Sequence, residues 1–151
     1  MQRALAACVC AIALAAPGAS VGQTQAGWSY AYVDGVATAT ERDDRGRVTA
    51  TLTCRPPEGD IVLSDFTMGR QARRARTTAV RIGAMSVNVP SSVQGRGRSQ
   101  ALTINLPQRP PILAAVQPTD QLSVTVGSQT RTFRDGGPQR MREVAYACWG
   151  S

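Results

Sequence analysis

The sequence predicts a mainly β protein, an antiparallel β-sandwich with a short C-terminal α-helix. Three observations support this fold class. Residues 48–54, VTATLTC, alternate apolar and polar side chains, as in a strand with one buried face. Glycine and proline turns separate several other short apolar segments, which is typical of sandwiches and barrels. After Pro138, apolar residues recur with helical spacing, which indicates one helix near the end of the chain.

The first predicted element is a hairpin formed by residues 28–33 and 36–40. These β-prone segments flank Asp34-Gly35, a dipeptide that favours the tight turn between two antiparallel strands. One long strand with a bulge at this dipeptide is the alternative.

Three aromatic residues, Trp28, Tyr30 and Tyr32, share one face of the first predicted strand. If exposed, such a stripe could stack on sugar rings. The chain has only two Trp, three Tyr and two Phe, however, and the core needs large side chains. We therefore expect these three residues in the core.

The central predicted strand, 48–54, places Val48, Ala50, Leu52 and Cys54 on its core face. The apolar segments that follow predict further strands at 61–66, 77–83, 85–90 and 101–107, and a hairpin within 118–133 about Gly127-Ser128.

The last predicted element is the C-terminal helix, for which Pro138 is a suitable first residue. One helical face holds Met141, Val144, Ala145 and Cys148. Gly150 can end the helix. Cys148 is therefore expected on the buried face.

The N-terminal residues 1–26 have the order of a secretory signal peptide. Arg3 precedes an uncharged apolar run from Ala4 to Ala16, and helix-breaking and small residues follow it. The run is shorter than the about 20 residues that span a bilayer. A buried N-terminal helix is the alternative.

Cleavage is expected after Ala26 or after Gly22. Residues 27–151 would then form a single β-sandwich domain with no transmembrane segment in the mature chain, in the periplasm or outside the cell. Such a protein rarely meets DNA or RNA, so no nucleic acid partner is expected.

Export also suggests how the cysteines pair. Cys54 and Cys148 remain after removal of the signal peptide, and an oxidising compartment favours a disulfide between them. The bond would close a loop of roughly 95 residues and stabilise the fold by on the order of 4 kcal/mol in the chain-entropy model. Two separate buried thiols are the alternative.

The residue types present exclude several chemistries. The chain has no histidine and no lysine, which removes catalytic triads with a His base, His-ligated metal sites, Schiff bases and Ser-Lys dyads. Carboxylates remain at Glu41, Asp43, Asp44, Glu58, Asp60 and Asp65, and we expect them to lie in solvated turns. The sequence therefore predicts no catalytic residues, no metal site and no cofactor, and a protein that is not an enzyme. A calcium site at residues 41–44 and a carboxylate-based hydrolase are the alternatives.

Arginines are concentrated in residues 69–81, GRQARRARTTAVR. We expect this segment to be an exposed loop that enters a strand. In an extended chain its arginines would point to both faces, which suggests solvation and protection of a sheet edge. Contact with an anion or a protein partner is the alternative. The residues proposed for that contact are Arg70, Arg73, Arg74 and Arg76.

Four segments resemble small exported β-sandwich proteins of Proteobacteria: WSYAYVDG, LTCRPPEGDIVL, PPILAAVQPTDQLSV and FRDGGPQRMREVAYAC. Both the type VI secretion-associated periplasmic proteins and the invasion-associated locus B proteins have an early Trp, a mid-chain Leu-x-Cys and a C-terminal helix closing on Cys. The resemblance implies an accessory role in the cell envelope and no catalytic residue.

Together these observations predict an exported, non-enzymatic binding or accessory module of the cell envelope that contacts a protein partner. The sequence does not identify that partner. A binder of anionic envelope polymers through the arginine-rich loop is the alternative, and a carboxylate-based hydrolase is a third reading.

Overall fold

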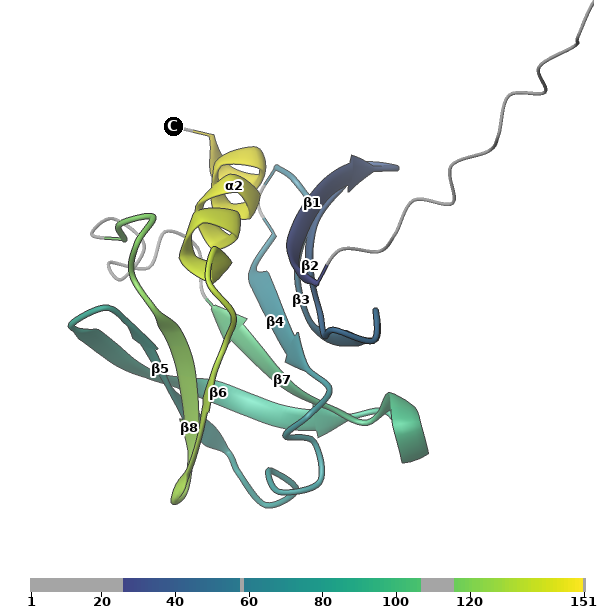
Figure 1. Cartoon of the computed structure of the whole chain (residues 1–151), viewed down its shortest axis with the longest axis vertical. Helices are drawn as coiled ribbons and strands as arrows, with labels where there is room; N and C mark the ends of the chain where they lie inside the picture. The colour runs from purple at the N-terminus through teal and green to yellow at the C-terminus, as the bar shows by residue number, and fades with distance from the viewer. Residues whose placement is uncertain (1–25, 58, 107–115, 151) are drawn as a thin grey trace, which may run out of the picture.

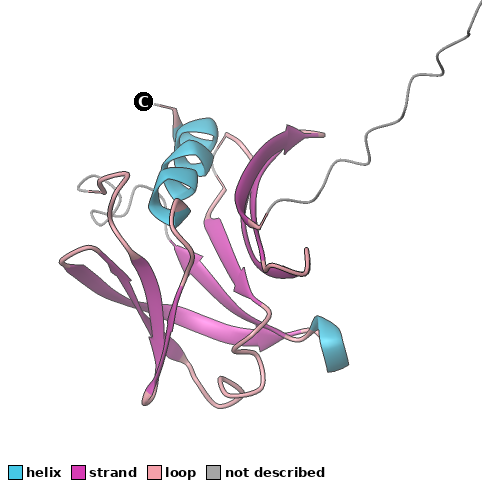
Figure 2. Ribbon diagram, viewed as in Figure 1, coloured by secondary structure: helices cyan, strands magenta, loops and turns pink. Residues whose placement is uncertain are grey.

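A computed structural model describes residues 26–57, 59–106 and 116–150 (Figures 1 and 2). The predicted signal peptide falls almost entirely outside these residues. The strands are β1 (Gly27–Val33), β2 (Val36–Arg42), β3 (Val48–Cys54), β4 (Ile61–Asp65), β5 (Thr77–Ile82), β6 (Met85–Gln94), β7 (Ala101–Leu106), β8 (Leu122–Val126) and β9 (Gln129–Thr132). A 3-10 turn, η1 (Gly97–Ser99), and a helix, α2 (Gly137–Trp149), complete the described elements.

Among the described residues all strand pairs are antiparallel and form one nine-stranded sheet in the order β1-β2-β3-β4-β7-β6-β5-β8-β9. The prediction of a mainly β fold with a short C-terminal helix is confirmed. Two separate sheets, as in a sandwich, are not observed, because β6 connects both halves. Its first part, Met85–Pro90, pairs with β5, and its second part, Ser91–Gln94, pairs with β7. The sheet curls, so that β5 and β8 lie across from β3 and β4 (Figure 1).

The predicted hairpin is confirmed: β1 and β2 meet at Asp34-Gly35, and Val33 pairs with Val36. Both turn residues have positive φ, 51° for Asp34 and 73° for Gly35. This is the two-residue turn whose twist matches that of the strands, and it tolerates Asp and Gly well. The turn at Gly127-Ser128 between β8 and β9 is likewise as predicted.

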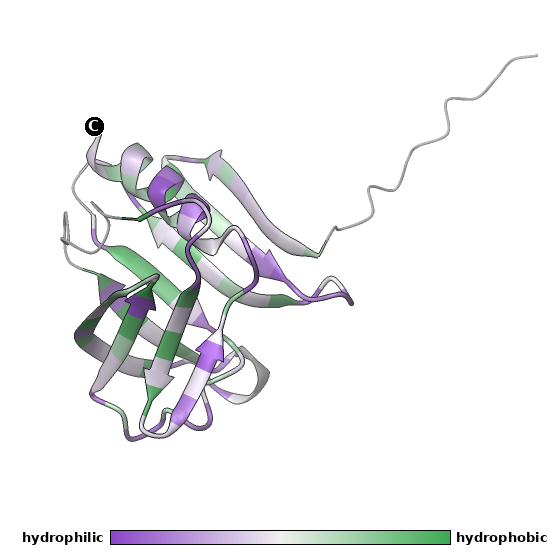
Figure 3. Ribbon diagram, turned by 60° about the vertical axis from the view of Figure 1, so that its left-hand side comes forward, coloured by the Kyte–Doolittle hydropathy of each residue, from purple (hydrophilic) through white to green (hydrophobic). Residues whose placement is uncertain are grey.

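The core fills the inside of the curled sheet. Residues on the inner face of each strand are buried and alternate with more exposed ones, as Figure 3 shows by bands of different hydropathy along the strands. Fully buried members include Leu52, Ile61, Leu63, Leu102, Ile104, Leu106, Val80 and Val124. Val48, at the start of β3, is 37% exposed and differs from the prediction.

The C-terminal helix packs on β1, β2 and β3 (Figure 1). Pro138 lies in its first turn, and Met141, Val144 and Cys148 are buried as predicted. Gly150 follows the helix with a φ of 72°, a conformation that favours glycine.

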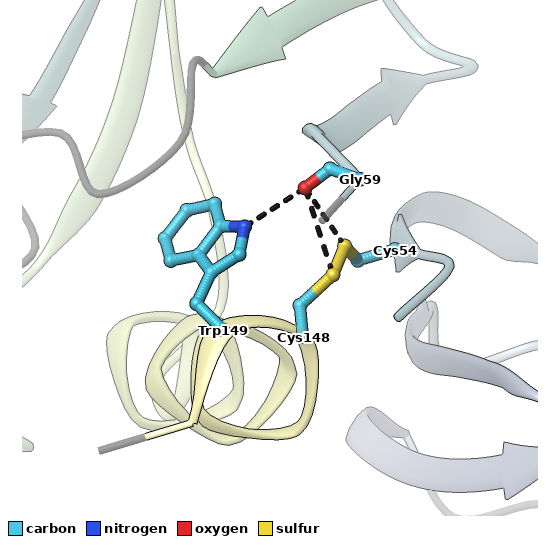
Figure 4. Close-up of a disulfide and its surroundings, with 4 residues drawn as sticks. All are labelled: Cys54, Gly59, Cys148 and Trp149. Atoms are coloured by element: carbon cyan, nitrogen blue, oxygen red, sulfur yellow. Dashed lines mark hydrogen bonds between the residues drawn. A yellow bond between two sulfur atoms is a disulfide. The ribbon is translucent and has the colours of Figure 1, made fainter. Parts of the chain in front are cut away.

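The Cys54–Cys148 disulfide is present, with 6.0 Å between the Cα atoms, and it fastens the last turn of α2 to the end of β3 (Figure 4). Trp149 donates a hydrogen bond of 2.8 Å from Nε1 to the carbonyl oxygen of Gly59. Both sulfur atoms lie against the same oxygen, so one short segment holds the disulfide and the indole together.

Candidate functional site

The outer edge of β1 is the first candidate surface. Within the described residues β1 pairs with β2 alone, so its other backbone edge has no strand partner there. The strand is seven residues long and contains neither a charge nor a proline. Tyr32 and Val33 are 56% and 59% exposed. Proteins usually protect edges with charges, prolines or short strands, and β1 has none of these features.

A groove of about 620 Å³ lies beside β1, against the exposed face of α2. Its lining includes Tyr30, Pro118, Gln139, Arg142, Tyr146 and Ala147. Tyr146 is 67% exposed, and its ring stands on the solvent side of the helix. We call the β1 edge and this groove together the edge surface.

Contacts of β1 and α2 with the rest of the fold position the edge surface. Trp28 packs against Phe133 with 6.1 Å between ring centroids, and its Nε1 donates to the carbonyl oxygen of Arg134. Trp28 and Tyr30 pack against the core, as expected. The expectation is wrong for Tyr32, which lies near the turn end of β1 and is 56% exposed.

The arginine-rich segment is the second candidate region. As predicted, it is an exposed loop that enters a strand, β5, and its four proposed contact residues are all exposed. The expected extended geometry is wrong, because residues 66–74 form successive turns. The Ala72 amide donates to the Met68 carbonyl at 3.0 Å, and both side chains are buried. The loop therefore has a fixed inner face, and its arginines project from the opposite side.

A second groove, of about 600 Å³, lies between this loop, the start of β3 and η1. Its lining includes Arg47, Phe66, Thr67, Arg70, Gln71 and Gln100, and we call it the arginine groove. Of the proposed contact residues only Arg70 lines it. Arg73 lies close by and donates to the Gln100 side chain at 3.5 Å, whereas Arg74 and Arg76 are not among the lining residues.

Arg47 is a member of this groove that the sequence analysis missed. Its guanidinium binds Asp43, with Nη2 and Oδ2 2.7 Å apart. Hydrogen bonds from the Arg47 side chain and backbone hold the pKa of Asp43 below its ordinary value. Asp44, which lies in the same turn as Asp43, pairs with Arg134 after β9 and raises the pKa of that guanidinium. Asp44 is 80% exposed in a solvated turn, as predicted, whereas the side chain of Asp43 in the same turn is only 18% exposed.

Two other carboxylates, Glu41 and Asp65, are buried, contrary to the expectation of solvated turns. They flank Ala50 in one row across β2, β3 and β4. Arg131 from β9 reaches over this small residue and forms ion pairs with both carboxylates. Its guanidinium carbon also lies 4.3 Å from the centre of the Phe133 ring.

This buried network ties β9, at the far edge of the sheet, to β2 and β4. Glu41 also accepts hydrogen bonds from Thr49 and from the Arg134 amide. The two carboxylates share one guanidinium and are closed to solvent, so they do not face each other across an open cleft, as a glycosidase requires. The network is a structural feature. Glu58 lies outside the described residues, and Asp60 is exposed.

The described residues contain no group of three or more His, Cys, Asp or Glu side chains that could hold a metal ion. None of their helices has the length and apolar character needed to cross a bilayer. Comparison with family models, curated proteins and solved structures finds no match for this chain.

Proposed function

We propose that this protein is an exported, non-enzymatic binding module of the cell envelope, and that it docks to a protein partner by strand addition at β1. The observation that carries the proposal is the uncharged, seven-residue outer edge of β1 with its exposed Tyr32 and Val33. An extended segment of the partner would continue the sheet through main-chain hydrogen bonds.

The groove beside β1 supports the same binding mode. A residue opposite Tyr30 on an added strand would have its Cβ about 4.5–5.5 Å from that of Tyr30, on the same face of the sheet. That face borders the groove in which Tyr30 and Tyr146 lie. Alternate apolar side chains of the partner would therefore enter the groove, and these contacts would give specificity.

The other edge of the sheet, β9, is less suited to strand addition by a partner. β9 has only four residues and includes Arg131, whose side chain is engaged in the buried network. Short edge strands are one of the usual protections against pairing, so we assign the docking role to β1.

Three features support the cellular setting of the proposal. The N-terminal sequence has the order of a signal peptide. A buried disulfide between Cys54 and Cys148 is typical of proteins in an oxidising compartment. The four segments that resemble exported proteobacterial proteins point to the envelope as well.

Crosslinking in intact cells tests the docking role. A photoreactive residue at Val33 should give one discrete adduct with a partner protein. Ala31→Lys places a charge on the β1 edge and should abolish this adduct, whereas Gln129→Lys on β9 should leave it unchanged. An adduct that persists in Ala31→Lys contradicts the proposal, as does an adduct with the mass of two copies of this chain.

A further inference from the structure

We propose that the arginine groove binds the acid groups of an anionic polysaccharide, at a site separate from the edge surface. The loop after β4 and η1, which border the groove, lie at the end of the sheet away from α2 (Figure 1). The lining residues of the groove are not part of the edge surface. Binding here does not depend on strand addition at β1.

Hydrogen bonds and close packing fix the conformation of the loop that forms one wall of the groove. One oxygen of Asp65 accepts hydrogen bonds from the amides of Thr67 and Met68, at 2.7 and 3.2 Å, and thereby starts the first turn. Gly69 is buried against the other wall, where an added Cβ would lie 2.7 Å from the carbonyl oxygen of Gln100. The loop that carries Arg70 therefore sits directly on the segment after η1, with its conformation set before any ligand binds.

The charge in the groove favours an anion. Among the described residues Arg70 forms no ion pair, and its guanidinium fork is available for a carboxylate or sulfate. Asp43 orients Arg47 on the opposite wall and neutralises part of its charge. Arg73 adds positive charge at the rim, where it contacts Gln100.

The remaining lining suits a sugar chain better than a peptide. Gln71 and Gln100 offer side-chain amides that pair with sugar hydroxyls. The Thr67 hydroxyl donates to Asp65 at 2.8 Å, so its oxygen can only accept from the ligand. Phe66 is 36% exposed and can pack on a sugar ring. The adjacent strands β3 and β4 each have a partner on both sides, so no backbone edge is available for a peptide strand. The volume lies within the range of about 300–1,000 Å³ of small-ligand sites.

Binding of polygalacturonate oligosaccharides, measured by calorimetry at two salt concentrations, tests the inference. Wild-type protein should bind this acidic probe and should not bind a neutral glucan of the same length. Arg70→Ser should weaken binding about tenfold or more, as expected for the loss of one well-placed charged contact. Arg74→Ser is the matched control: it removes the same charge from the same loop outside the groove and should change affinity less than threefold.

A second variant separates a shaped site from simple charge attraction. Phe66→Ala keeps every charge and should weaken binding about threefold to tenfold at both salt concentrations, whereas purely electrostatic binding would be unaffected. Equal losses for Arg70→Ser and Arg74→Ser overturn the inference. It is also overturned if vesicles of acidic lipid or an acidic peptide bind more tightly than the polygalacturonate. Circular dichroism should confirm that all three variants remain folded.

Discussion

Two regions in which arginine side chains lie near carboxylates differ in burial, with opposite consequences. Inside the curled sheet, Arg131 joins Glu41 and Asp65, and all three side chains are nearly closed to solvent. At the surface, Arg47 contacts Asp43 with 70% of its side chain exposed, and Arg70 forms no ion pair among the described residues. Burial makes the first cluster a requirement of the fold. Solvation leaves the guanidinium groups of the surface region accessible to an external anion.

The largest effect is expected from Arg131→Met. This variant leaves two buried carboxylates without their shared cation, and one oxygen of Asp65 already lacks a hydrogen bond partner within the described residues. Removing one partner from a buried ion cluster costs about 3–5 kcal/mol. Urea denaturation should show this loss, with Arg74→Ser as a control of nearly unchanged stability. A loss below about 1 kcal/mol would mean that the buried cluster behaves like a surface pair.

The disulfide provides a covalent counterpart to the ionic network, because each joins distant parts of the chain. Replacing Cys54 and Cys148 with Ala should lower the free energy of unfolding by about 2–5 kcal/mol, the range for native disulfides in small secreted domains. Urea titrations under non-reducing conditions measure the change. After reduction, the wild-type protein should have the same free energy of unfolding as the double variant. A wild type that keeps its stability after complete reduction contradicts the assignment.

The smallest effect is expected from Asp43→Asn at the surface. Arg47 holds the pKa of Asp43 below its ordinary value, so the contact stabilises the folded state above the ordinary pKa. This stabilisation is lost as the pH falls through the lowered pKa. The free energy of unfolding of the variant should therefore be slightly lower than that of the wild type near neutral pH, and the two should converge as the pH falls through the lowered pKa of Asp43. A difference in the free energy of unfolding that grows as the pH falls would contradict this prediction.

Local patterns were sufficient to predict several parts of the fold. The Asp34-Gly35 turn, the alternation in β3 and the apolar face of α2 each depend on residues close in sequence. The disulfide followed from two such faces and from the expected compartment. The helical face Met141, Val144 and Cys148 needed no tertiary information, because a 3.6-residue period marks it directly.

The parts that could not be predicted depend on contacts between distant residues. Glu41 and Arg131 lie 90 positions apart, and nothing near either one indicates that they meet. Strand β6 changes partners midway, which a pattern within one strand does not reveal. The turns of the arginine loop did leave a signal: Met68 and Ala72 are spaced as on one helical face, and Asp65 precedes Thr67 as in a capped turn.

The disulfide also closes residues 54–148 into a covalent ring, here called the circle, and leaves the N-terminal part of the chain, here called the tail, outside it. The circle runs from Cys54 to Cys148 across 94 positions, and its described residues include six strands, β4 to β9, and nearly all of α2. The tail holds β1, β2 and most of β3, so the proposed docking strand lies outside the circle. Its attachment depends on noncovalent contacts such as those of Trp28 with Phe133 and of Glu41 with Arg131. Local opening of the β1–β2 hairpin can therefore occur while the circle stays closed, and amide hydrogens there should exchange before those of β4 and β7.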